Sequence, residues 1–249
     1  MISRAAPDAS ERAPGCIAQI ETQHAMASAL EDFRRVFGSS QPAADSFRKP
    51  SDRTIGLLAQ KAKKAPGACA KMNELLEKDQ PTCLHSVSVS TLMMSVGQRM
   101  NMTEELVIDL GFSGLLHDIG KIEIPDTLLN KALPLNSTDR RLLQRHPDAG
   151  FKLLSLDSGV SQMTLDICRY HHELLDGSGY PAGLKGTEIS LAVRITTVCD
   201  VFDALTTRRP YKRSWSAGEA LRWLYQRPNH YDSDIVRQLD ASLAPNSLD

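Results

Sequence analysis

The 249-residue sequence has few cysteines, no excess of either charge and no long apolar run. Its five cysteines are an odd number and none stands in C-x-x-C spacing, which argues against a disulfide framework and favours a reducing, cytoplasmic environment. A formal net charge of −1 disfavours a protein that coats a nucleic-acid polymer, because such proteins carry a basic excess. No stretch approaches the roughly 18 apolar residues of a membrane helix, and no apolar run follows the first residues as in a signal peptide.

The residues that are present predict helices. With 41% apolar residues the chain can bury a sizeable core. Strand signals are scarce, and the longest alternation of β-branched residues covers only positions 188–193. Thr103 is a good N-cap, and Ser216 with Glu219 forms a capping box. We therefore predict an all-α fold with helices near 54–64, 68–78, 84–100, 103–117, 138–146, 161–173 and 190–206, and one that starts at 216. Pro147 is expected to interrupt the helix that reaches His146 and to start another turn or helix.

The chain divides into two parts of unequal length. We expect a small helical N-terminal region over residues 1–79, with a flexible start, a helix near 17–37 and a linker near 39–50 that contains two prolines. The main domain is predicted over 80–249. The N-terminal region is expected to pack on this domain or on a second copy of the chain, which leaves a homodimer open.

Histidines are concentrated in the middle of the chain. Together with two aspartates on apolar segments they form a set that costs several kcal/mol to bury unless a metal organises it. A lone histidine on an apolar helix is more often a hydrogen-bonded core residue. The number of these groups shifts the balance toward ligands, and imidazoles with carboxylates suit Fe, Mn, Ni or Zn. The set is His85, His117, His146, His171, His172, Asp118 and Asp200.

Several motifs in this region resemble one family. The run 117–121 (HDIGK) resembles the signature of the HD superfamily of metal-dependent phosphohydrolases, and 171–181 (HHELLDGSGYP) resembles the marker of its HD-GYP branch. The runs 200–206 (DVFDALT) and 209–212 (RPYK) agree with this. The similarity extends from about position 85 to the C-terminus. It implies an HD-domain helical bundle that hydrolyses cyclic di-GMP with two or three metal ions.

The resemblance also implies a division of the ligands. One metal would be held by His85, His117 and Asp200, and the other by His146, His171 and His172. Asp118 would bridge them, since a carboxylate has two oxygens and can span two cations ~3.5–4 Å apart. Some family members bind a third metal through a glutamate four residues before the first histidine, where this chain has Pro81. We therefore expect two divalent transition-metal ions, with Fe or Mn favoured and Ni or Zn left open.

Further roles follow from the same resemblance. Lys121 would stabilise the phosphate or assist the leaving oxygen, beside Asp118 in the catalytic centre. Arg209 and Lys212 would contact phosphate and guanine, and Tyr180 would be an aromatic residue near the substrate. Gly179 and Pro181 would shape the loop. Asp203 lies three residues after Asp200 and would orient a ligand histidine or Lys121.

These assignments predict a cyclic di-GMP phosphodiesterase in which a water bridging both metals becomes the attacking hydroxide. The product would be pGpG, with GMP left open. One alternative is a non-catalytic receptor or adaptor that binds the cyclic dinucleotide, or a protein partner through the loop at 179–181. Another is an HD phosphohydrolase of a different cyclic dinucleotide.

Overall fold

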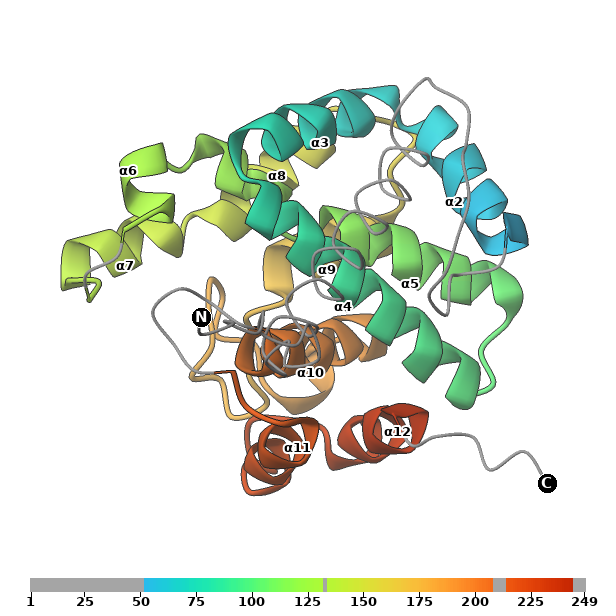
Figure 1. Cartoon of the computed structure of the whole chain (residues 1–249), viewed down its shortest axis with the longest axis vertical. Coiled ribbons are helices and arrows are strands. Elements are labelled where there is room, and N and C mark those ends of the chain that lie inside the picture. The colour runs from blue at the N-terminus through green and yellow to red at the C-terminus, as the bar shows by residue number, and fades with distance from the viewer. Residues whose placement is uncertain (1–51, 132–133, 208–213, 244–249) are drawn as a thin grey trace, which may run out of the picture.

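The computed structural model describes residues 52–131, 134–207 and 214–243 (Figure 1). The helix expected near 17–37 and the linker near 39–50 lie outside these residues, as do Arg209 and Lys212. All the regular elements that it does describe are helical, which confirms the all-α prediction. None of the described helices has the combined length and apolarity needed to cross a membrane.

Most of the helices follow one another with short connections, and a longer segment joins α9 to α10. Their bounds are α2 Asp52–Lys64, α3 Pro66–Lys78, α4 Gln80–Arg99, α5 Glu104–Leu116, α6 Asp126–Leu129, α7 Ser137–Leu143, α8 His146–Leu154, α9 Gln162–Tyr170, α10 Leu191–Thr206, α11 Ala217–Tyr225 and α12 Ser233–Leu243. Two short 3-10 helices, η1 and η2, cover Ile119–Glu123 and Gly186–Glu188. Positions 188–193 form no strand, because the Ser190 side chain caps α10 by accepting from the Val193 N–H.

Capping residues set most of the helix starts. Thr103 caps α5 and Ser216 with Glu219 forms the capping box of α11, both as predicted. The predicted helix at 138–146 is wrong in its bounds. Asn136, with Asp139 three residues on, makes the reciprocal box that starts α7. A second helix then begins at His146 and has a proline in its first turn, where no backbone N–H is required.

Helix α4 lies between two hydrophobic clusters and is the central element of the fold (Figure 1). Cys83 and Met94 contribute to the cluster formed with α2, α3, α5 and α8. Val89, Met93 and Val96 belong to the cluster formed with α10, α11 and α12. Because opposite sides of α4 are buried in this way, its position determines how the two halves of the described structure meet. All the described cysteines are free thiols.

The N-terminal helices α2 and α3 share the first of these clusters with α4 and α5. Helix α3 has no side-chain cap of its own. Its N-terminus is bound instead by Asp157, from the loop between α8 and α9, whose Oδ2 accepts from the N–H of Gly67 (2.7 Å) and Ala68 (3.1 Å). A Cβ on Gly159 in the same loop would overlap the carbonyl oxygen of Lys64, so the loop lies directly against the α2–α3 junction. Residues on both sides of the boundary predicted at 79 therefore pack together.

Replacement of Asp157 by Ala should destabilise the fold, because two N–H groups at the start of α3 lose their acceptor. The expected loss is about 1 kcal/mol in the free energy of unfolding, and hence a Tm lower by about 2–4 °C. Thermal unfolding followed by circular dichroism measures it. Asp166→Ala, which removes only an exposed contact with Gln162, is the matched control and should leave Tm within 1 °C or so. Equal Tm values for the two variants would contradict the capping role.

Candidate metal centre

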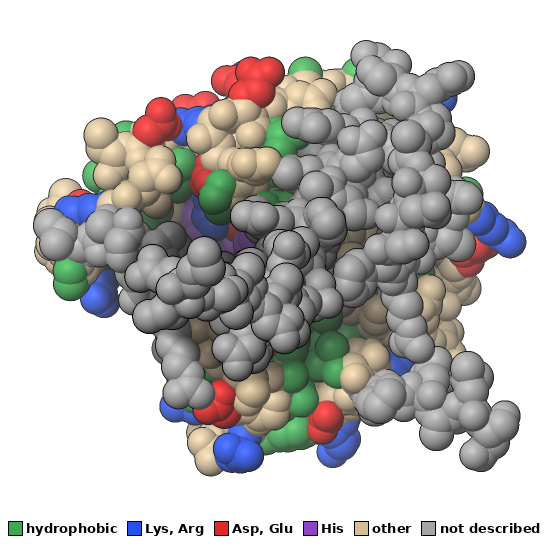
Figure 2. Space-filling view, viewed as in Figure 1, with side chains coloured by type: hydrophobic (Ala, Val, Ile, Leu, Met, Phe, Trp, Pro, Cys, Tyr) green, Lys and Arg blue, Asp and Glu red, His purple; other side chains and the backbone are tan. Residues whose placement is uncertain are grey.

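The seven predicted ligands converge on one place. They come from α4, from the ends of α5 and α9, from the start of α8 and from the middle of α10. Histidine side chains are visible at the bottom of a hollow in the surface (Figure 2). Their ligand atoms form overlapping groups in which every atom lies within 4.8 Å of the others, and the groups are Asp118/His146/His171/His172, His85/His117/Asp118 and His117/His171/Asp200.

Three of the histidines have their tautomer set by the backbone. Nδ1 of His117 lies 2.8 Å from the carbonyl of Gly114, and Nδ1 of His146 lies 2.7 Å from that of Leu143. Nδ1 of His171 is 3.0 Å from the carbonyl of Cys168. Because a carbonyl only accepts, each Nδ1 carries the proton and each Nε2 keeps its lone pair. All three residues stand at helix ends, so that unpaired carbonyls of the last turn or a preceding turn orient the ligands.

The Nε2 atoms and Asp118 make a centre that is poorly satisfied without a cation. His117 Nε2 and Asp118 Oδ1 are buried and make no hydrogen bond. His146 Nε2 and His171 Nε2, both lone-pair atoms, face each other at 3.3 Å. Buried polar atoms in this arrangement cost free energy, and a cation between them removes that cost. The donor set therefore fits a divalent metal.

The two oxygens of Asp118 face different histidines. Oδ1 lies 3.1 Å from His146 Nε2 and 3.7 Å from His171 Nε2. Oδ2 lies 3.3 Å from His117 Nε2 and 3.8 Å from His85 Nε2. Since the carboxylate is only 2% exposed, it is held between these two sets of imidazoles.

His85 is held by two carboxylates from α10. Its Nε2 lies 2.9 Å from Asp200 Oδ1, and its Nδ1 lies 2.6 Å from Asp203 Oδ2. Asp203 also accepts from the hydroxyls of Ser88 and Thr207. Asp203 was expected to orient either a ligand histidine or Lys121, and the contact in the structure is with the candidate ligand His85. Burial alone lowers the pKa of His85, but the hydrogen bonds to Asp200 and Asp203 raise it to about 9.

Burial and neighbouring charge also affect the other ligands. Burial raises the pKa of Asp118, but Lys121 and His117 outweigh it and hold that pKa well below its usual range. Burial lowers the pKa of His172 to about 3 and, together with the neighbouring His172, brings that of His171 well below its ordinary value. At neutral pH the carboxylate is therefore charged and these two imidazoles are neutral, which are the protonation states that bind metals.

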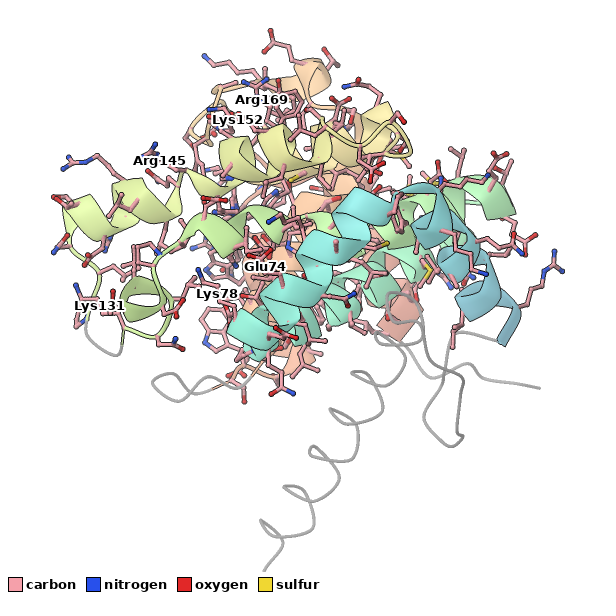
Figure 3. All side chains as sticks on the ribbon, turned by 90° about the horizontal axis from the view of Figure 1, so that it is seen from above. Glu74, Lys78, Lys131, Arg145, Lys152 and Arg169 are labelled. Atoms are coloured by element: carbon pink, nitrogen blue, oxygen red, sulfur yellow. The ribbon has the colours of Figure 1, made fainter. Side chains whose placement is uncertain are left out.

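Lys121 points to the centre from η1. Its Nζ lies 2.5 Å from Asp118 Oδ2, and its side chain is 22% exposed. A Cβ on Gly120 would overlap the carbonyl oxygen of His146, so this glycine lets η1 pack directly on the first turn of α8. Lys78, at the end of α3 (Figure 3), donates to the carbonyl of Ile122 (2.6 Å) and holds the other end of η1.

The loop after His172 lies against the centre. The ring of Tyr180 stacks on His172 with 4.7 Å between centroids, and the Tyr180–Pro181 peptide is cis. A Cβ on Gly179 would lie 2.5 Å from the Cα of Glu173, so only glycine fits there.

The carboxylate of Glu173 is the residue that sequence reasoning missed. It is buried and accepts from the N–H of Ala182 (2.6 Å), Gly183 (3.1 Å) and Leu184 (3.0 Å), which fixes the exit of the loop. A charged residue inside the His-His-Glu run was the available signal.

The structure offers no ligand at the position of the third metal. Pro81 lies in the first turn of α4, and Glu77 belongs to none of the ligand groups found among the described residues.

Comparison with known proteins gives a consistent picture. The sequence profile of the family described as HD domain matches residues 58–235. The chain is 41% identical over 172 residues to the cyclic di-GMP phosphodiesterase PA4108 of Pseudomonas aeruginosa, covering 69% of this chain and 42% of that protein. It is 39% identical over 147 residues to the 3′3′-cGAMP-specific phosphodiesterase 1 of Vibrio cholerae, covering 58% of this chain and 33% of that protein. The chain thus spans less than half the length of these curated relatives.

A solved structure supports the fold. Bd1817, an HDG"Y"P protein from Bdellovibrio bacteriovorus, superposes with a TM-score of 0.59 at 17% identity, over 90% of this chain and 80% of that one. The resemblance predicted from the motifs at 117–121 and 171–181 is confirmed, and the chain belongs to the HD domain family.

Proposed function

We propose that this chain hydrolyses a phosphodiester bond of cyclic di-GMP at a centre of two divalent metal ions, with pGpG as the first product. The observation that carries the proposal is Asp118, a buried carboxylate whose oxygens face two different sets of histidine Nε2 atoms. A carboxylate with two oxygens can serve two cations at the spacing found in two-metal phosphoryl-transfer sites. The relatives named as cyclic dinucleotide phosphodiesterases support the reaction class.

In this proposal the ligands divide as the resemblance implied. His85, His117 and Asp200 would hold one ion, His146, His171 and His172 would hold the other, and Asp118 would serve both. Bound there, the ions would supply Lewis acidity that activates water and neutralises charge on the phosphate. Asp203 keeps the His85 ring oriented through its 2.6 Å contact with Nδ1.

Lys121 and the loop act on the substrate itself. The Lys121 ammonium, next to Asp118 and partly exposed, can neutralise a phosphate oxygen or give a proton to the leaving oxygen. Tyr180 presents an aromatic ring beside the centre on which a guanine can stack. Gly179 and Pro181 shape the loop, and Arg209 and Lys212 stay predicted contacts to phosphate and guanine.

A second candidate substrate is 3′3′-cGAMP, because one relative at 39% identity is named as specific for it. A receptor without turnover is the third candidate. The complete candidate ligand set argues against it, since a module that only binds nucleotides has no use for seven clustered metal-ligating side chains.

Two metal ions per chain are expected in the anaerobically purified protein, with Fe or Mn favoured. Inductively coupled plasma mass spectrometry on the wild type and on Asp118→Ala measures the count. The wild type should contain about two ions and the variant at most one, because the variant lacks the bridge. Removal of the metal by a chelator should also lower Tm, since an ion at 100 times its Kd stabilises the fold by about 2.7 kcal/mol. Asp166→Ala is the control, and a wild type with a single ion contradicts the proposal.

Turnover should depend on the ligands and on Lys121. His117→Ala combined with Asp118→Ala should abolish hydrolysis of cyclic di-GMP. Lys121→Met should lower kcat by about 10²–10³-fold while metal content is kept, because a charge aimed at the developing anion is lost. Lys71→Met is the matched control, since Lys71 only pairs with Glu74 at the surface. Chromatography of the nucleotide products reports all of these rates, and turnover by the double variant would rule out the metal mechanism.

A substrate panel separates the candidate functions. We expect kcat/KM for cyclic di-GMP to exceed that for 3′3′-cGAMP by about tenfold or more, which corresponds to about 1.4 kcal/mol of discrimination. Calorimetric binding measured beside product formation completes the test. The reverse ratio assigns the second substrate, and tight binding without product assigns the receptor role.

A further inference from the structure

The turn between α11 and α12 contacts the loop that carries Tyr180. His230, in this turn, accepts from the Leu175 N–H through its carbonyl (3.2 Å). Its Nε2 lies 3.2 Å from Asp176 Oδ2, and both side chains are 36% exposed. The sequence around His230 has none of the distinctive neighbours that mark the ligand histidines, so from sequence alone this residue is interpreted as a surface residue.

Asp176 connects this contact to the tip of the loop. While Oδ2 faces His230, Oδ1 accepts from the N–H (2.9 Å) and the hydroxyl (2.6 Å) of Ser178. Gly177 between them has a φ of 81°, so the carboxylate closes a tight turn that only a glycine forms without strain. Two residues further on, the Tyr180 N–H donates to the carbonyl of His172 (3.2 Å) and its ring stacks on the same residue.

We propose that His230 is a positioning residue for the substrate loop: its imidazolium holds Asp176, and through the Asp176–Ser178 turn it holds Tyr180 over the metal centre. This inference rests on the proposed function, since it assigns Tyr180 to substrate binding. The histidine acts through Asp176 and does not itself reach the reacting atoms.

The other charged groups near His230 have partners of their own. Glu173 accepts from three backbone N–H groups of the loop, and Arg194 on α10 donates to Asp232 (2.5 Å). Together with His230 and Tyr231 these residues line a cavity of about 10 Å³, the size of one water. Lys185 lies with its alkyl chain against Gly177. Asp176 is therefore the carboxylate that His230 meets directly.

The contact has a definite pH dependence. The hydrogen bonds from Ser178, with a smaller contribution from His230, lower the pKa of Asp176, so this carboxylate stays ionised to a lower pH than an ordinary aspartate. A histidine is ordinarily charged below about pH 6.5. The charge attraction between the two side chains therefore requires a protonated imidazole, whereas the backbone hydrogen bond at Leu175 does not.

Steady-state kinetics on the full chain tests the proposal. KM for cyclic di-GMP is measured near pH 6 and near pH 8 in the wild type, His230→Gln and His230→Lys, all loaded with Mn²⁺. The three proteins have the same metal centre, so the ratio of KM in a variant to KM in the wild type reports the contact between His230 and the loop. His230→Gln should raise KM about threefold at the lower pH and leave it unchanged at the higher one, with kcat altered less than KM. His230→Lys, charged at both values, should keep the low KM at pH 8.

Hydrogen exchange measured by mass spectrometry provides a readout that needs no turnover. The peptide spanning 174–181 should lose protection near pH 6 in His230→Gln and in Asp176→Asn, but not in the control Asp234→Asn, which removes an exposed pair with Arg237 on α12. The proposal is overturned if wild type and His230→Gln have the same ratio of KM near pH 6 to KM near pH 8 and the same hydrogen-exchange protection of the 174–181 peptide. If the protection changes while no cyclic dinucleotide is turned over, the contact stands and the proposed function fails.

Discussion

The burial of one carboxylate among imidazoles is the constraint on which the rest of the structure depends. Asp118 is almost fully enclosed, and its oxygens lie 3.1 Å and 3.3 Å from two different histidine Nε2 atoms. An isolated carboxylate in that position would cost several kcal/mol. The Lys121 ammonium and the surrounding imidazoles make this burial tolerable, and a divalent metal would offset the remaining cost. The stability of the core and the charge balance of the candidate metal centre therefore depend on the same buried groups.

The helices meet this constraint at their ends. His117, His146 and His171 each occupy the first or last turn of a helix, where backbone carbonyls without an intrahelical partner accept from Nδ1. The same carbonyls that a buried helix end must satisfy thus orient the ligands. Gly120 allows two of these ends to approach within a distance that any side chain would prevent. The geometry of the candidate ligands follows from close helix packing, and changes in that packing would alter the distances between their Nε2 atoms.

Much of this could be predicted from local sequence. The helical period, the caps at Thr103 and Ser216, and the types of the ligand residues are all properties of short segments. The bounds predicted at 138–146 were wrong because the Asn136–Asp139 box, and not Thr138, starts the helix, which already ends at Leu143. The new helix expected around Pro147 is present and begins at His146. The importance of Glu173 was missed because its three partners are backbone N–H groups nine to eleven residues away, which carry no side-chain signature.

By itself, the sequence determined that the described part is helical, that imidazoles and carboxylates are its chemistry, and which family it resembles, because helix periodicity and motif spacing are local properties. Tertiary structure alone decided that Asp118 faces two histidine sets, that Asp157 caps a helix ninety positions earlier and that His230 meets Asp176. Each of these contacts joins segments far apart in the chain. Its geometry depends on how whole helices pack, and no short run of residues encodes that.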